Sequence, residues 1–418
     1  MTLQDMMRTM GDNAREASRR MATLSTRRKN IALRAMAAAV DTRRDLIKAA
    51  NARDLEAGRK AGLSAAMLER LTLDDARIDG VIRGLREVAD LPDPVGRCLN
   101  RRRRPNGLVI LKQRVPIGVI VIIYESRPNV TADAAALCVK TGNAVILRGG
   151  KEACHSNQAL AEALTVGGAE AGLPDCAVQF VATTDREAVR ELVQMDDRVD
   201  VVIPRGGESL IRAVVEQARV PVIKHYKGVC HIFVDESADV DQALAIIENA
   251  KCQRPGVCNA VETLLVHAAL APVLLPRLAE LCRRRQVEVR ADETARTLVP
   301  EFKPADEADW WAEYLDLILA LRIVPDTDAA IAHINAYGSH HSDAILTRND
   351  ASARAFTREV DSAAVYVNAS TRFTDGGEFG MGAEMGISTD KLHARGPMGL
   401  EELTTYKYVI QGNGQIRP

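Results

Sequence analysis

Between residues 115 and 205 the chain alternates short apolar runs with longer stretches of helical periodicity. Each apolar run is continuous, so the strand that it predicts should be buried on both faces. Strands of this kind, joined by helices of about ten or more residues, form a parallel sheet covered by helices. The pattern predicts an α/β fold with nucleotide-binding architecture. The runs are GVIVIIY (residues 118–124), NAVILRG (143–149), AVQFVA (177–182) and DVVIP (200–204), with helices expected over 132–140, over 156–171 and again before residue 200.

A chain of 418 residues is too long for one hydrophobic core, so two or three domains are expected. The net charge of -1 argues against a general nucleic-acid or membrane-surface binder. The eight cysteines form no CxxC pair and no zinc-ligand spacing, which predicts a reducing compartment and no disulfide framework. The N-terminal segment is charged, and no run of about 18 apolar residues exists to span a bilayer. A cytoplasmic location is therefore expected.

Residues 1 to about 95 carry apolar residues at three- and four-residue spacing, which predicts helices. Their arginine pairs are interleaved with acidic residues and are interpreted as solvated helix faces. A hairpin should follow, because Pro105, Asn106 and Gly107 supply a turn between two short strand-like runs. We interpret the basic run at residues 101–104 as a charged strand edge that discourages wrong pairing, rather than as a nucleic-acid site.

Cys258 is the candidate nucleophile of the sequence. Pro255 and Gly256 break regular structure just before it, so a tight bend could present its thiol to a cleft. A cation such as Arg254, or backbone N–H groups aimed at the sulfur, would increase the fraction of thiolate. A cysteine can equally be a small buried hydrophobic residue, and the local sequence alone leaves both interpretations open.

The segment RPGVCNAVETLLVH (residues 254–267) is similar to the active-site segment of the gamma-glutamyl phosphate reductase family of the aldehyde dehydrogenase superfamily. The resemblance implies an aldehyde dehydrogenase-like α/β fold, with two parallel-sheet domains and a small β-arm for oligomerisation. It implies an NADPH-binding domain over residues 1–94 and 114–226, a catalytic domain over 227–390, and an arm made of 95–113 and 391–418, with a strand at 406–410. The similar blocks follow the expected order and comprise residues 115–157, 200–211, 225–239, 313–324 and 365–388.

The resemblance implies NADPH-dependent reduction of L-glutamyl 5-phosphate to L-glutamate 5-semialdehyde and phosphate. This is the second step of proline biosynthesis from glutamate, and it would pass through a thioester on Cys258. The alternatives are another acylating reductase that acts on an acyl-CoA, and a catalytically silent oligomeric scaffold. A homo-oligomer is expected, and the acyl phosphate is expected to come from a separate glutamate 5-kinase.

The cofactor site lacks the GxGxxG fingerprint. By resemblance, Gly206 and Gly207 form the phosphate turn between a strand and a helix. Arg148 and Lys151 stand where the superfamily has a lysine and a glutamate facing the adenosine ribose, so Lys151 would attract a 2′-phosphate and favour NADPH over NADH. Lys151 could also merely extend from a helix start. The superfamily has a glutamate on the nicotinamide ribose. Glu313 and Asp316 both stand near its place and neither aligns cleanly, so the role stays open, with Glu313 as the candidate.

Two further positions follow from the resemblance. Asn129 would donate its amide N–H to the oxyanion formed when Cys258 attacks a carbonyl; on sequence alone it could instead cap the following helix. His225 stands where aldehyde-oxidising relatives have a glutamate that activates water. A reductase of an acyl phosphate needs no such water, and a structural role for His225 is favoured.

Substrate recognition requires groups for an α-carboxylate and an α-ammonium. The proposed carboxylate ligands are Asn368, Ser370, Thr371 and Arg372, and the proposed ammonium ligand is Asp375, Glu378 or Glu384. Arg254 is a further candidate for substrate binding. No metal site is predicted. His340 and His341 are adjacent, so on an extended segment they should point to opposite faces.

Overall fold

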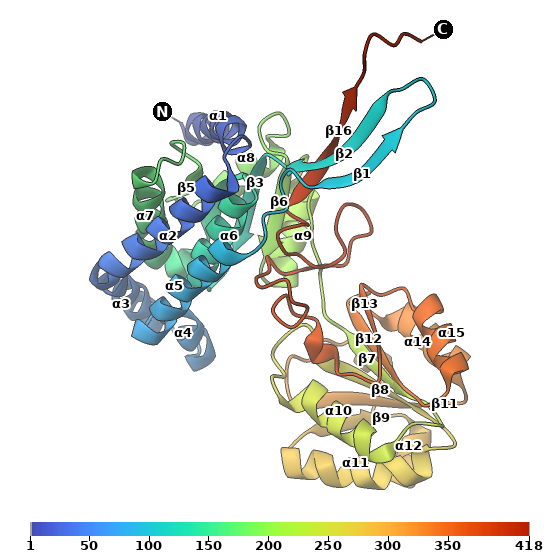
Figure 1. The fold of residues 1–418 in the computed structure, drawn as a ribbon. Helices are drawn as coiled ribbons and strands as arrows, with labels where there is room; N and C mark the ends of the chain where they lie inside the picture. Colours follow the sequence, from blue (N-terminus) through green and yellow to red (C-terminus); the bar gives the residue numbers. More distant parts are fainter. Residues whose placement is uncertain (1, 418) are drawn as a thin grey trace. The chain divides into compact units, whose positions relative to one another are not determined.

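The computed structural model describes residues 2–417, and the chain divides into two compact units, through which Figure 1 traces the backbone. The first unit contains the chain up to Lys224, Gly380–Gly386 and the segment from Met398 onward. The second contains His225–Phe379 and Ile387–Pro397. Part of the predicted arm segment, residues 391–418, thus belongs to the second unit.

The first unit is built on a four-stranded parallel sheet in the order β5-β4-β3-β6, which confirms the sheet predicted from the apolar runs. All six residues of β3 are buried, as expected for a strand covered on both faces. Helix α6 begins before the predicted residue 132, because Pro128 opens it one residue ahead of Asn129. The elements are β3 (Val119–Tyr124), α6 (Asn129–Lys140), β4 (Ala144–Gly149), η1 (Lys151–Ala153), α7 (Cys154–Glu170), β5 (Val178–Phe180), α8 (Glu187–Gln194), β6 (Val201–Arg205) and α9 (Glu208–Gln217).

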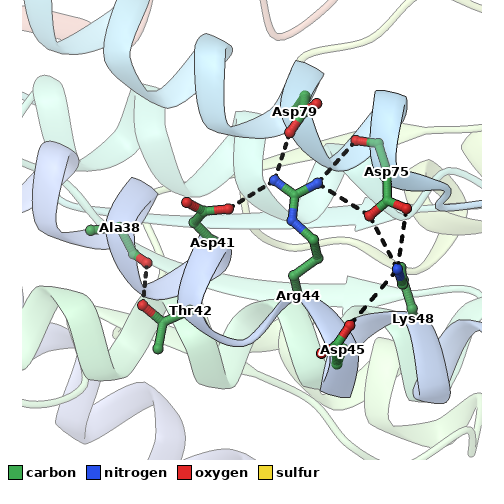
Figure 2. A network of polar contacts seen from close by, with 8 residues as sticks. All are labelled: Ala38, Asp41, Thr42, Arg44, Asp45, Lys48, Asp75 and Asp79. Carbon is green, nitrogen blue, oxygen red and sulfur yellow. Dashed lines mark hydrogen bonds and ion pairs between the residues drawn. The ribbon is translucent and has the colours of Figure 1, made fainter.

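The predicted N-terminal helices are confirmed as α1 (Leu3–Met21), α2 (Thr26–Thr42), α3 (Arg44–Lys60), α4 (Ala65–Leu71) and α5 (Asp75–Asp90). Figure 2 shows how charges join three of them. Arg44 at the start of α3 donates to Asp41 of α2 at 2.8 Å and to Asp79 of α5 at 2.6 Å. Asp75 of α5 accepts from both Arg44 and Lys48. These hydrogen bonds raise the pKa of the Arg44 guanidinium. Arg44 belongs to an arginine pair that was predicted to lie on a solvated helix face, and here it also connects helices.

The β-arm is a three-stranded antiparallel sheet in the order β1-β2-β16. Strands β1 (Cys98–Arg103) and β2 (Val109–Pro116) form the predicted hairpin, and Gly107 has the positive φ of 89° that its turn requires. Strand β16 (Thr404–Gln411) pairs with β2 along its whole length, which confirms the strand predicted at residues 406–410.

The second unit holds a seven-stranded sheet in the order β10-β9-β11-β8-β7-β12-β13, and every pair in it is parallel. Helices α10, α11 and α12 share one core cluster with the sheet, while α14 and α15 pack in another. The elements are β7 (Cys230–Val234), α10 (Val240–Cys252), β8 (Val261–His267), α11 (Ala271–Arg285), β9 (Glu288–Ala291), α12 (Glu293–Leu298), β10 (Lys303–Pro304), α13 (Glu307–Trp310), β11 (Ile318–Val324), α14 (Thr327–Tyr337), β12 (Ser342–Leu346), α15 (Asp350–Glu359), β13 (Ala364–Val367), η2 (Thr371–Phe373), β14 (Ile387–Ser388) and β15 (Gly396–Pro397).

Strands β8, β7 and β12 are neighbours in this sheet, and their parallel direction brings their amino ends to one edge. The segments that lead into these strands carry Cys258, Gly228 and His341 respectively. Among residues 2–417, no helix is long and apolar enough to cross a membrane.

Candidate active site

The loop of residues 253–260 carries Cys258 from the end of α10 to the start of β8. Helix α10 ends at Cys252 because Pro255 and Gly256 cannot continue it. Cys258 is partly exposed on this loop, while the two residues that follow it are buried. The nucleophile predicted from sequence is therefore accessible to a substrate, on a bend that is anchored on its downstream side.

Gly228 lies directly against the backbone of Cys258. A Cβ atom placed on Gly228 would be 1.9 Å from the Cys258 carbonyl oxygen, a distance that no side chain can adopt. Two residues further on, the thiol of Cys230 donates to the same carbonyl oxygen at 3.2 Å. Burial raises the pKa of Cys230, so this thiol stays protonated and acts as a donor. Neither residue was predicted to belong to the site, because local sequence cannot reveal a contact with a residue 28 to 30 positions away in the chain.

Two histidines flank the sulfur. One ring nitrogen each of His225 and His341, together with the Cys258 sulfur, lie within 4.8 Å of one another. The Nδ1 atom of His225 lies 2.9 Å from the carbonyl oxygen of Ile387, and the two imidazole rings meet edge to face with centroids 5.7 Å apart. The prediction that His340 and His341 point apart fits the contacts, because His340 interacts with the Asp361 carbonyl instead. His341, however, has ligand-type neighbours that the sequence did not reveal.

Asn259 fastens the nucleophile loop to the segment that follows β13. Its amide donates to the Thr374 carbonyl at 2.9 Å, and its own carbonyl accepts from the buried Thr371 hydroxyl at 2.7 Å. The guanidinium of Arg372 donates to the side-chain oxygen of Asn259 and, at 2.9 Å, to Gln253. Thr371 and Arg372, both predicted as substrate ligands, are thus brought to the loop of Cys258. Asn259 stands beside the cysteine in the sequence and was not singled out.

The other predicted substrate ligands have different surroundings. Ser370 is buried and caps η2 by accepting from the Arg372 backbone at 3.3 Å. Asn368 uses both ends of its amide on the backbone of Thr347, each at 2.8 Å. Arg254 is exposed on the nucleophile loop. Burial and then the positive charge of Arg254 lower the pKa of Arg372, so two cations lie close to each other beside the loop.

Glu313 lies against the segment that precedes β7, where its carboxylate accepts from the Gly228 backbone N–H at 2.9 Å. It therefore contacts the glycine that abuts Cys258. Asp316, the other residue considered for the same role, accepts from the backbone N–H of its neighbour Leu317.

The predicted phosphate turn lies in the first unit, between β6 and α9. Gly207 caps α9, and its N–H donates to the carboxylate of Glu125 at 2.9 Å. A Cβ atom on Gly206 would be 2.3 Å from the same carboxylate, so a larger residue there would require the Glu125 side chain to shift. The N-terminus of α9 and the exposed Lys151 are groups that suit an anionic cofactor phosphate, which would have to displace the Glu125 carboxylate from the Gly207 N–H.

The two cations of the predicted cofactor site differ in exposure. Arg148 is buried, and its guanidinium donates to the carbonyls of Gly149 at 2.9 Å and Thr184 at 3.1 Å. Burial lowers its pKa. Lys151 is exposed at the first position of η1. The side chain of Arg148 thus braces the backbone, and Lys151 is the cation open to a ligand.

Asn129 is the first residue of α6 and does not cap it, so the capping interpretation is wrong: the N-cap is Pro128, which offers no side-chain hydrogen bond. The amide of Asn129 donates instead to Asp133, one turn further on, at 2.9 Å. Burial raises the pKa of Asp133 to about 6. The carboxylate fixes the rotation of the amide group that was predicted to be the oxyanion donor.

The chain's sequence matches known proteins along this whole architecture. Residues 3–308 match the aldehyde dehydrogenase family. The chain is 56% identical over 417 residues to the gamma-glutamyl phosphate reductase of Geotalea daltonii, with 100% of both chains covered, and 57% identical over 411 residues to that of Moorella thermoacetica, with 98% of each covered. The crystal structure of gamma-glutamyl phosphate reductase from Thermotoga maritima matches with a TM-score of 0.97 at 48% identity, covering 99% of this chain and 100% of that one. The chain belongs to the gamma-glutamyl phosphate reductase family of aldehyde dehydrogenases.

A buried pair of opposite charges borders the nucleophile loop on both sides. Lys251 near the end of α10 donates to Glu262 of β8 at 2.7 Å, and both side chains are almost fully buried. Burial raises the pKa of Glu262 to about 7, although Lys251 opposes the shift. The folded state therefore favours the protonated form of Glu262, and ionisation of this group costs stability.

We expect Glu262→Gln to change how stability depends on pH. Below a pH of about 4.5 the wild-type side chain is neutral in both states; as the pH rises toward about 7, its deprotonation in the unfolded state lowers the free energy of unfolding. The variant has no carboxyl group at this position and therefore no such loss of stability. Relative to wild type, its free energy of unfolding should rise by up to about 3 kcal/mol between pH 5 and pH 8. Urea unfolding of both proteins at both pH values measures this difference in the free energy of unfolding.

The matched control is Glu56→Gln, which removes the carboxylate of the exposed Glu56–Lys60 pair and should leave the pH dependence unchanged. If Glu262→Gln were instead less stable than wild type by about 3–5 kcal/mol at pH 8, the attraction of Lys251 would outweigh the burial of the carboxylate.

Proposed function

We propose that this member of the gamma-glutamyl phosphate reductase family reduces L-glutamyl 5-phosphate to L-glutamate 5-semialdehyde and phosphate, using NADPH and a thioester on Cys258. The observation that carries the proposal is the surroundings of Cys258. An accessible thiol lies on a loop that Asn259 anchors, with two imidazoles near its sulfur, Arg254 on the loop and Arg372 beside it. The cations suit an anionic acyl phosphate, and the thiol suits its carbonyl carbon.

In the first half-reaction the Cys258 thiolate attacks the acyl carbon, the bond from that carbon to the phosphate oxygen breaks, and phosphate leaves with the electron pair. The nicotinamide cofactor, when bound, supplies the hydride that reduces the thioester. Collapse of the resulting hemithioacetal returns the electron pair to the sulfur and releases the semialdehyde. Arg254 and Arg372 would hold the anionic groups of the substrate, and the amide of Asn129 would donate to the oxyanion.

Gly206, Gly207 and Lys151 are proposed to bind the cofactor, with Lys151 on the 2′-phosphate, and Glu313 is proposed to hold the nicotinamide ribose. The support for Lys151 is its exposure at the first position of η1, where its charge can reach a ligand. The support for Gly207 is the position of its backbone N–H at the N-terminus of α9, where an anionic group is favoured. For Arg148 we propose an indirect part, because its guanidinium braces the turn before η1.

We expect the reverse reaction to depend on phosphate. The carboxylates that border the nucleophile loop are engaged, Glu262 by Lys251 and Glu313 by the Gly228 N–H, so neither is placed to activate water against the thioester. With glutamate semialdehyde and NADP⁺ but no phosphate, the enzyme should release a burst of about one equivalent of NADPH per site and then stall. Added phosphate should restore turnover, followed by absorbance of NADPH.

Two controls sharpen this assay. Cys258→Ala should abolish the burst, whereas Cys252→Ala, on the end of α10, should keep it. Coenzyme A in place of phosphate tests the rival acyl-CoA reductase, which would turn over with CoA and not with phosphate. Steady NADPH formation without either acceptor, with free glutamate as product, would refute the proposed lack of a water-activating base.

We expect Lys151→Glu to raise KM for NADPH at least about 10-fold and to change KM for NADH much less, because a carboxylate would then face the 2′-phosphate. Lys151→Gln should have a smaller effect of the same kind. Lys60→Glu, a charge reversal on an exposed lysine of α3 in the same unit, is the control. Steady-state kinetics with both cofactors measure the effect. If the ratio of kcat/KM for NADPH to kcat/KM for NADH were unchanged in Lys151→Glu, Lys151 would not contact the 2′-phosphate.

We further propose that the β-arm forms a homo-oligomer. Its last strand exposes apolar side chains on the edge strand of the arm sheet: Tyr406, Tyr408 and Ile410 are 48%, 58% and 57% exposed. Such a strand edge favours pairing with another chain. The double variant Tyr408→Lys/Ile410→Lys should shift the mass measured by light scattering to that of a smaller species, with the fold retained by circular dichroism. An unchanged mass would place the interface elsewhere.

A further inference from the structure

The three side chains around the candidate nucleophile also form a ligand set for a metal ion. A thiolate sulfur and two imidazole nitrogens are ligands that zinc prefers, and three protein ligands with an open fourth position are typical of accessible zinc sites. Here Cys258, His225 and His341 each present one such atom, and the three atoms lie within 4.8 Å of one another. Zinc–sulfur bonds of about 2.3 Å and zinc–nitrogen bonds of about 2.0 Å place ligand atoms roughly 3.5 Å apart, so only small side-chain rotations are needed.

The ring nitrogens of His225 can be assigned from its partner. A carbonyl oxygen only accepts hydrogen bonds, so the Nδ1 atom that lies 2.9 Å from the Ile387 carbonyl must carry the proton. In the neutral imidazole the Nε2 atom then has a free electron pair for a metal. Metal-binding histidines commonly have this arrangement, in which a backbone carbonyl fixes the tautomer and the ring orientation.

His341 is supported in a similar way from the other side of the cluster. Its Nδ1 atom lies 2.9 Å from the hydroxyl of Ser342, which in turn lies 2.6 Å from the Thr374 hydroxyl. Tyr366 continues the chain with a contact of 2.7 Å to Thr374. The Ser342 hydroxyl can accept a hydrogen bond from the Nδ1–H group when Nε2 binds a metal ion, and the row of hydroxyl groups holds the ring in place.

We propose that Cys258, His225 and His341 bind Zn²⁺ and that the bound ion blocks the nucleophile. Binding replaces the thiol proton with a sulfur–zinc bond, and the proton goes to solvent; no other bond changes. Water takes the fourth position. The nearby positive charges of Arg254 and Arg372 oppose the cation, so the affinity is lower than that of a structural zinc site and binding is reversible by a chelator.

The thiol of Cys230 is the nearest competing ligand, because its sulfur lies 3.8 Å from the His341 Nδ1 atom. It is fully buried, and its thiol donates to the Cys258 carbonyl at 3.2 Å, so metal binding by this sulfur would break that hydrogen bond. The proposal therefore assigns the metal–sulfur bond to Cys258 alone.

The test uses the full-length, reduced, chelator-treated enzyme without substrate or cofactor. Titration with Co²⁺ should produce a thiolate-to-cobalt charge-transfer band at one ion per chain, and Zn²⁺ should remove the band. Cys258→Ser should lose the band, and His225→Asn and His341→Asn should each weaken Co²⁺ binding at least about 10-fold. His340→Asn, Cys252→Ser and Cys230→Ser are the matched controls and should retain it.

A second measurement avoids any effect of the variants on folding. In the wild-type enzyme, Zn²⁺ should protect Cys258, located by mass spectrometry, from alkylation, and the protection should end when EDTA is added. No band and no protection, loss of the band in Cys230→Ser, or equal weakening by His340→Asn would overturn the proposal. Inhibition of turnover by Zn²⁺ rests on the proposed function, whereas the band and the protection do not, so failure of one is distinguishable from failure of the other.

Discussion

The contact between the Gly228 backbone and the Cys258 carbonyl is the constraint on which the rest of the candidate site depends. It allows no side chain at residue 228, and it brings the segment before β7 against the loop before β8. His225, three positions earlier, thereby comes to the sulfur, and Cys230, two positions later, reaches the same carbonyl with its thiol. The N–H of Gly228 is then directed to Glu313. One close approach of two backbones therefore orders a thiol, an imidazole and a carboxylate.

The electrostatics of this arrangement match a reaction that passes an acyl group from phosphate to sulfur. Positive charge is supplied by Arg372 and Arg254, and burial followed by the charge of Arg254 lowers the pKa of Arg372. Two carboxylates that border the nucleophile loop already have partners, because Glu262 is held by Lys251 and Glu313 accepts from a backbone N–H. An anionic acyl phosphate is attracted, and the thioester that it leaves behind is not exposed to a carboxylate-activated water. A hydrolytic enzyme would need the opposite arrangement.

Much of the fold could be predicted from the sequence because its signals are local. Continuous apolar runs predicted the parallel sheet, and the turn at Pro105 to Gly107 predicted the hairpin. The start of α6 was misplaced because Pro128 opens the helix ahead of the apolar pattern. The site was harder to predict, because its contacts join segments that are far apart in the sequence: Asn259 contacts Thr374, and His341 lies near Cys258. Local sequence cannot reveal which segments the parallel order of β8, β7 and β12 brings to one edge.

The same limit applies to side chains that look ready for a ligand. Asn368 and Arg148 were both predicted to bind small molecules, and both use their polar atoms on nearby backbone. An unpaired polar group costs free energy when buried, so the fold employs such side chains wherever a carbonyl or N–H group lacks a partner. A polar side chain remains available for a ligand only where the backbone groups around it already have hydrogen-bond partners. The sequence does not show which side chains these are.

The turn that was predicted to bind the cofactor phosphate, between β6 and α9 of the first unit, has no glycine-rich fingerprint. The N–H of Gly207 at the start of α9 donates to Glu125, so a carboxylate already lies where the helix dipole favours an anion. A cofactor phosphate would have to compete with this carboxylate for the N–H group, and the two negative charges would repel each other. Binding would then depend on side-chain cations such as the exposed Lys151, more than on the backbone cradle that a GxGxxG loop provides.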